Sequence, residues 1–154
     1  MKVSRRRGVV RLKLEPVESA LLVGLLDDLA EALEELSPDD PVRRRLYPDG
    51  HRDDATIAGE FRDLTESSLH EERTLRLGQC RAEVELGVAP LELGEDEVRR
   101  WLQVTNDLRL AIGTRLGVTE ESIVIDPDSP DAQAWAIYHW LSALQDALVD
   151  SVMG

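Results

Sequence analysis

The sequence contains few of the residues that usually carry out chemistry. Cys80 is the only cysteine, so a disulfide within one chain is excluded and a reducing cytoplasm is the expected setting. The three histidines lack the same-face spacing of a zinc-binding helix, and a glycine-rich phosphate loop and a nucleophile elbow are also missing. No apolar run approaches the length of a bilayer span or of a signal-peptide core. We therefore predict no catalytic residue, no cofactor, no metal and no membrane contact.

Charge is abundant but mostly of one sign. The chain has 31 acidic and 18 basic residues and a net charge of −13. Six of the basic residues lie within positions 1–13, where there is no acid, so the rest of the chain is more acidic than the average. An acidic body repels nucleic acid and anionic membranes and favours a protein partner with a basic surface. Solubility alone is the alternative explanation of the charge, and residues 1–8 are expected to form a flexible basic arm.

Hydrophobic periodicity predicts a mainly α fold, with about four long helices in a single domain over residues 1–154. Alternation of Val10, Leu12 and Leu14 predicts a short N-terminal strand, and Pro16 suits the first position of a helix. The long helices are expected over residues 16–36, from Asp54 to an undefined end beyond Ser68, over residues 95–116, and from Ser129 onward, the last with Ile137, Leu141, Leu144, Leu148 and Val152 on its inner face. A short turn holds Val42 and Leu46. Residues 123–125 are a candidate second strand that would pair with residues 9–14.

Residues 113–128 resemble the middle of a helix-turn-helix motif, but their charge is wrong for DNA. Gly117 sits at the expected turn, yet the would-be recognition helix begins with Glu120 and Glu121 and meets Pro127 after about two turns. A helix in the major groove must approach phosphates, which requires basic or amide side chains. No specific nucleic acid is therefore expected as a partner. Direct DNA binding through residues 1–13 or 110–125 is the alternative.

A polar stripe lies on the predicted helix over residues 95–116. Asn106, Arg109 and Gly113 share one face, and the glycine would let another helix approach closely. Asn106 and Arg109 could then bond to the backbone of that helix or to the imidazole of His139. Two interpretations stay open: a buried polar network that sets helix register, and a recognition patch with Arg115 at its edge.

Aromatic residues gather at the start of the last predicted helix. His139 lies between Tyr138 and Trp140 and close to Trp135, a spacing typical of core packing in which each polar tip finds a partner. The alternative is a ligand pocket lined by Trp101, Trp135 and Trp140. An enzyme or small-molecule binder would use Trp101, Asn106, Arg109 and His139 around such a pocket.

Cys80 is a candidate redox residue because of its neighbours in sequence. Arg73, Arg76 and Arg81 are near it, and cations stabilise a thiolate if the sulfur is exposed. Sensing would then use an intermolecular disulfide or a mixed thiol adduct. The alternative is an inert packing residue.

Several short motifs together resemble one family. They are Leu14-Glu15-Pro16 after the basic start, residues 39–44, Tyr47-Pro48-Asp49, residues 60–65, the Asn106-Asp107-Leu108-Arg109 stretch through Gly117, and Tyr138-His139-Trp140-Leu141. These resemble an actinobacterial family first described as a domain of unknown function and later named oxidative-stress regulators. The resemblance covers nearly the whole chain. It implies a cytoplasmic helical protein connected with transcriptional control of stress and sulfur metabolism. Redox sensing in that family is tied to two closely spaced cysteines, whereas this chain has Cys80 alone.

The sequence therefore predicts a non-enzymatic regulatory or adaptor protein. It would act by docking an acidic helical surface onto a basic protein, with a component of the transcription machinery as the expected partner and a homodimer left open. Asn106, Asp107, Arg109, Arg115, His139 and Trp140 are the candidate interaction or polar-network residues.

Overall fold

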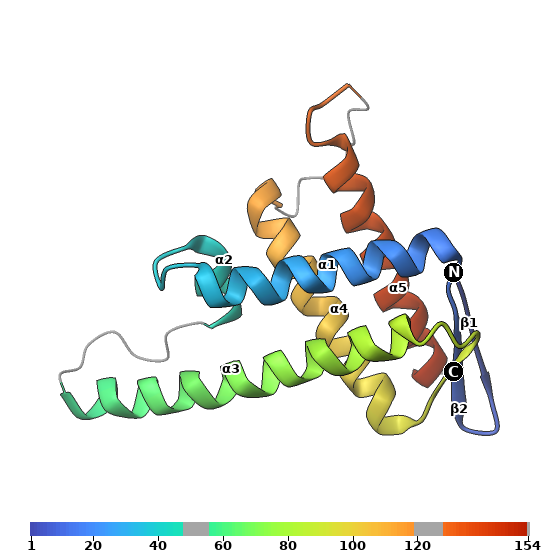
Figure 1. Cartoon of the computed structure of the whole chain (residues 1–154), viewed down its shortest axis with the longest axis horizontal. Helices are drawn as coiled ribbons and strands as arrows, with labels where there is room; N and C mark the ends of the chain where they lie inside the picture. Colours follow the sequence, from blue (N-terminus) through green and yellow to red (C-terminus); the bar gives the residue numbers. More distant parts are fainter. Residues whose placement is uncertain (48–55, 119–127, 154) are drawn as a thin grey trace.

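The computed structural model describes residues 1–47, 56–118 and 128–153 and confirms a mainly α architecture. The helices are α1 (Pro16–Glu35), α2 (Pro41–Leu46), α3 (Thr56–Glu85), α4 (Glu95–Leu116) and α5 (Ala132–Met153), and the strands are β1 (Lys2–Arg6), β2 (Val9–Lys13) and β3 (Leu91–Leu93). In Figure 1, α1 and α3 run along the long axis of the molecule, and α4 and α5 cross them. The strands lie at one end, close to both termini.

The N-terminal strand is part of a three-stranded antiparallel sheet in the order β1-β2-β3. Val10 and Leu12 of β2 are buried, as their alternation predicts. Arg7 (φ 53°) and Gly8 (φ 80°) form a two-residue turn with both residues at positive φ, the geometry that suits a tight hairpin. Residues 2–6, which were expected to belong to a flexible basic arm, form a strand paired with β2.

The central strand has neighbours on both edges. Val10 pairs with Arg5 of β1 and with Leu93 of β3. Residues 123–125 were the candidate second strand in the sequence. Those three residues lie outside the described part of the chain, as do Asp54 and most of the suspected recognition helix. Within the described remainder of that motif, Gly117 (φ 69°) ends α4 in the left-handed conformation.

Local signals explain where α1 begins and how it packs. Pro16 occupies the first turn, and Glu15 and Glu18 form a capping box that satisfies free backbone N–H groups. Leu22, Leu26, Leu29 and Leu33 are buried and follow one another at helical spacing. The predicted helix over residues 16–36 is confirmed to within one residue.

Helix α3 is longer than its sequence periodicity suggests. Leu77, Cys80 and Val84 are buried on its inner face, while Leu69 and Leu75 are exposed, which blurs the apolar pattern beyond Ser68. The helix continues to Glu85, and α1 packs along it.

Helices α4 and α5 form the closest helix pair. Leu141, Leu144 and Leu148 of α5 are fully buried as expected, but Val152 is 44% exposed because the helix extends past the core. A Cβ atom added to Gly113 of α4 would lie 3.1 Å from Cε2 of Tyr138, so the glycine does allow a close helix approach.

Candidate functional site

Arg109 joins α4 to α5 through uncharged side chains. Its Nε donates to Ser142 Oγ at 2.9 Å, its Nη1 to Gln145 Oε1 at 2.6 Å and its Nη2 to the hydroxyl of Tyr138 at 3.4 Å. Gln145 in turn donates to Asn106 Oδ1 at 3.4 Å. The sequence-predicted pair Asn106 and Arg109 therefore meets in one half-buried network that joins α4 to α5.

His139 does not belong to this network. Its side chain is exposed, and its ring stacks on Trp135 of the same helix with 6.1 Å between centroids. Contact with the imidazole was one of two options for Asn106 and Arg109, and their described hydrogen bonds do not include it; Tyr138, one position earlier, faces α4 instead.

The three tryptophans contact different parts of the fold. The indole of buried Trp101 donates to Glu83 Oε2 at 2.7 Å, and that of half-buried Trp140 donates to Glu18 Oε2 at 2.8 Å. Trp135 stacks on His139. These contacts join α4 to α3 and α5 to α1, so the tryptophans do not converge on one ligand pocket.

Asp107, on the opposite side of α4 from Arg109, is the centre of a buried ion pair. Arg73 donates through Nε to Asp107 Oδ2 at 3.1 Å and through Nη1 to the carbonyl of Leu46 at 2.9 Å. Burial raises the pKa of Asp107, although Arg73 and Arg76 act in the opposite direction. Asp107 therefore needs the positive charge of Arg73, because a buried carboxylate without a counter-charge destabilises the folded state.

A chain of polar contacts that the sequence did not indicate extends from this ion pair. The guanidinium of Arg73 lies 4.6 Å from the ring centroid of Tyr47. The Tyr47 hydroxyl is 2.9 Å from His70 Nδ1, and His70 Nε2 is 2.9 Å from Glu34 Oε1. These side chains connect α2, α3 and α1. Their sequence separations gave no periodic signal by which the chain of contacts could be found.

Cys80 is buried rather than exposed to solvent. Its side chain is fully buried, and burial raises the pKa of the thiol to about 11 despite opposing effects of Arg100 and Arg76. An exposed, readily ionised thiolate was the condition for redox sensing, and the folded chain does not provide it. Of the other arginines near Cys80 in sequence, Arg73 pairs with Asp107, and Arg81 pairs with Asp27 and Glu85.

The outer face of α1 carries charge of one sign only. The helix contains six acidic residues and no basic one. Its exposed positions include Asp27, Asp28, Glu31, Glu34 and Glu35. Asp27 pairs with Arg81 and Glu34 contacts His70, whereas Asp28, Glu31 and Glu35 have no ion pair with any described residue.

Arg115 of α4 and the arginines of α2 have different surroundings. Arg115 is exposed, and with Asp28 it borders a small groove of about 140 Å³ between α1 and α4. Arg44 pairs with Asp39 at 3.4 Å, and Arg43 donates to Leu33 O and Glu66.

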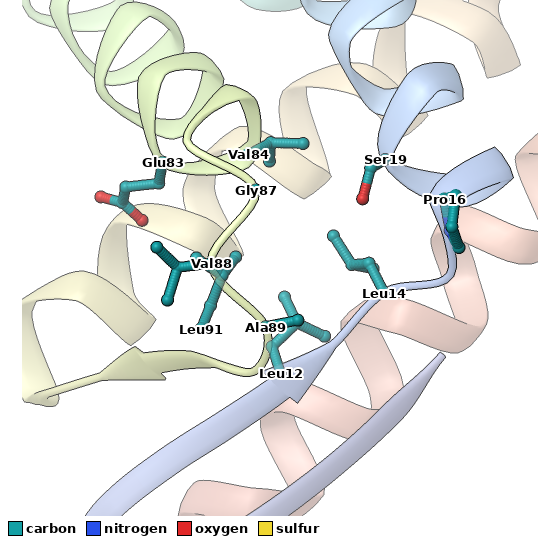
Figure 2. Close-up of a pocket in the computed structure, with 10 residues that line it drawn as sticks. All are labelled: Leu12, Leu14, Pro16, Ser19, Glu83, Val84, Gly87, Val88, Ala89 and Leu91. Atoms are coloured by element: carbon teal, nitrogen blue, oxygen red, sulfur yellow. The ribbon is translucent and has the colours of Figure 1, made fainter.

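An apolar hollow of about 350 Å³ lies where α1 begins and α3 ends. Its walls are Leu12, Leu14, Pro16, Ser19, Glu83, Val84, Gly87, Val88, Ala89 and Leu91 (Figure 2). In Figure 2, Leu14 and Ser19 extend into the gap between the two helix ends. The carboxylate of Glu83 is already engaged by Arg100 and Trp101, so the hollow suits an apolar group rather than a charged one. Sequence reasoning missed this hollow because its walls come from two distant segments, residues 12–19 and 83–91.

The described ranges contain neither a cluster of metal-ligand side chains nor a membrane-spanning helix. Within them, no three His, Cys, Asp or Glu side chains are grouped to hold a metal ion. None of the helices in these ranges has the length and hydropathy to cross a bilayer.

Comparison with known proteins identifies the family. Residues 1–152 match the domain of unknown function DUF2017. The chain is 33% identical, over 179 aligned positions, to proteins named oxidative stress regulator AosR from Mycobacterium tuberculosis and Mycobacterium bovis, with 94% of this chain and 82% of each relative covered. No solved structure matches the chain. The chain therefore belongs to the DUF2017 family, and its relatives' names support a stress-linked regulatory role.

Proposed function

We propose that this protein is a non-enzymatic regulator of oxidative-stress transcription that acts by protein–protein contact. The outer face of α1 docks onto a basic surface of a partner in the transcription machinery. The observation that carries the proposal is the set of three acidic side chains on α1, Asp28, Glu31 and Glu35, that lack an ion pair within the described chain.

The position of these acids supports a binding role over simple solubility. The C-terminal end of a helix carries a partial negative charge, so acidic residues there are unfavourable and basic ones are preferred. Glu31 and Glu35 lie near the end of α1, and its last turn contains no basic residue. Solubility could be supplied by acids at positions that do not oppose the helix dipole.

The apolar hollow gives the same helix an anchor point. Pro16 and Ser19, which line it, are in the first turn of α1, and Glu31 follows about 20 Å further along at the rise of an α-helix. Binding energy at protein interfaces is concentrated where a side chain fills a pocket, and surrounding charges add orientation. The partner segment would combine an apolar side chain for the hollow with cations for the acidic face.

The test is capture of a partner, followed by binding measurements with the purified pair. The immobilised full chain is exposed to a lysate of the encoding organism at low and moderate salt, and the captured protein is identified and purified. The triple variant Asp28→Asn, Glu31→Gln, Glu35→Gln should weaken its binding at least about tenfold, because three charge contacts are lost.

A matched control separates a specific face from net charge. Glu72, Asp146 and Asp150 are exposed acids on α3 and α5 without an ion pair in the described ranges. Neutralising these three changes the net charge equally and should leave the affinity nearly unchanged. Equal weakening by both triples, or no specific partner at either salt concentration, would contradict docking through α1.

A further inference from the structure

The charge on Arg109 is not balanced within the described chain. Its guanidinium is half-buried, and its three hydrogen-bond partners, Ser142, Gln145 and Tyr138, are all neutral. In a chain with 31 acidic and 18 basic residues, a half-buried arginine would be expected to find a carboxylate. Arg43, Arg73 and Arg100, which are also half-buried, each pair with a carboxylate, whereas half-buried Arg76 forms no ion pair within the described ranges.

A second arginine without a carboxylate partner in the described ranges lines the same cavity as Arg109. Arg45 is exposed in the last turn of α2, and within the described ranges it forms no ion pair. Its neighbour Arg44, by contrast, pairs with Asp39. Two such arginines therefore approach one region from different helices.

That region is a cavity. Arg45 and Arg109 line a space of about 600 Å³ together with Tyr138, Thr114 and an apolar group, Leu110, Gly113, Gly117 and Val118. The volume is within the range of small-molecule sites. From α5, Tyr138 borders the cavity, and its ring lies so close to Gly113 that a Cβ atom added there would be 3.1 Å from Cε2 of the ring.

We propose that this cavity binds a small organic anion, a carboxylate or phosphate attached to an apolar body. The guanidinium groups of Arg45 and Arg109 would hold the charged group, since arginine forms paired, charge-assisted hydrogen bonds with such oxygens. Leu110 and Val118 would contact the apolar body, and the Tyr138 hydroxyl would contribute a further polar contact. The site differs from the predicted tryptophan-lined pocket and shares only Arg109 with it. Binding of such an anion to Arg109 would act on the contact between α4 and α5, which is separate from the partner surface on α1.

The experiment is a titration followed by two-dimensional amide NMR. Benzoate and phenyl phosphate are the anionic probes, and benzamide is the neutral probe of similar shape. At least one anion should give saturable shifts of the Gly113, Gly117 and Val118 amide resonances, and benzamide at the same concentrations should not.

Variants of α2 make the result specific to the site. Arg45→Gln should weaken anion binding about tenfold, because a charge-assisted contact is lost. Because Arg45 is exposed, this substitution should leave the fold intact. Arg44→Gln removes the same charge one residue away, outside the cavity, and should leave the affinity unchanged. Shifts no larger than those with benzamide, or equal weakening by the two variants, would overturn the proposal.

Discussion

The indole Nε1 of Trp140 donates to Glu18 Oε2 at 2.8 Å, a contact between α5 and the first turn of α1 that spans 122 positions of sequence. The other oxygen of the carboxylate accepts from the amino group of Met1 at 2.7 Å and from the Glu15 amide at 2.8 Å. One side chain thus ties the N-terminus, α1 and α5 together.

Glu18→Gln should lower the free energy of unfolding by about 1–3 kcal/mol at neutral pH, because hydrogen bonds to a charged acceptor are lost. Burial alone would raise the pKa of Glu18, but the amino terminus, the Glu15 amide and the Trp140 indole together lower this pKa below its ordinary value. The stabilisation is therefore complete above the ordinary pKa and is lost as the pH falls through the folded value. Urea unfolding of both proteins across this range should show their difference shrinking in acid; a difference independent of pH would contradict it.

Arg73→Leu should destabilise the protein by about 3 kcal/mol, because Asp107 would remain buried without a counter-charge. The deficit should shrink as the pH falls, since protonated Asp107 needs no cation. Arg81→Leu is the control: it breaks the more exposed pairs with Asp27 and Glu85 and should lower stability by no more than about 1 kcal/mol. Denaturant unfolding measures both losses. Similar losses would show that the buried Arg73–Asp107 pair contributes no more to stability than the exposed pairs of Arg81.

Gly113→Ala and Gly78→Ala form a matched pair of helix-interior changes. At Gly78 of α3 an added Cβ meets nothing within 4 Å, so better helix propensity should raise the free energy of unfolding by about 0.5–1 kcal/mol. At Gly113 the new methyl group would meet Tyr138, whose ring is held by Arg109, and the gain should be cancelled or reversed. Thermal unfolding distinguishes the two, and an equal gain at both positions would refute the close α4–α5 approach.

Cys80 should resist alkylation in the native protein. With a pKa of about 11 the thiol holds roughly a hundredfold less thiolate at neutral pH than an ordinary cysteine, and burial also blocks the reagent. Iodoacetamide labelling followed by mass spectrometry should therefore proceed only as fast as the protein opens, and should become rapid in denaturant. Fast labelling without denaturant would restore Cys80 as a redox candidate.

Glu31→Gln with Glu35→Gln should stabilise the protein while impairing its proposed function. Removing two charges from the negative end of α1 should raise the free energy of unfolding by about 1 kcal/mol at low ionic strength. The gain should fade with added salt. A loss of stability would mean that these acids make contacts important for the fold, and would remove the argument for a binding role.

Local features were predictable because each depends on residues close together in sequence. The alternation of Val10 and Leu12, the proline at the start of α1 and the glycine at the end of α4 each reported a real boundary. Strand β3 was missed because three residues, Leu91–Leu93, are too short to show a period.

The candidate site was only partly predictable, because its contacts join distant segments. Helical spacing placed Asn106 and Arg109 on one face, but it could not tell whether Tyr138 or His139 would meet them, since a rotation of α5 by one residue decides. The same limit hid the contacts of Tyr47 with His70 and of Trp140 with Glu18. Sequence proximity of arginines to Cys80 also misled, because burial outweighs their charge.

The central claim, that the face of α1 meets a protein partner, is tested most directly by site-specific photo-crosslinking in living cells. A crosslinking residue replaces Glu31 on α1 or, as the control, Asp146 on α5, both of which are exposed. Docking through α1 predicts one dominant crosslinked protein with a basic surface from position 31 and none from position 146. Crosslinks to DNA, or the same products from both positions, would contradict it.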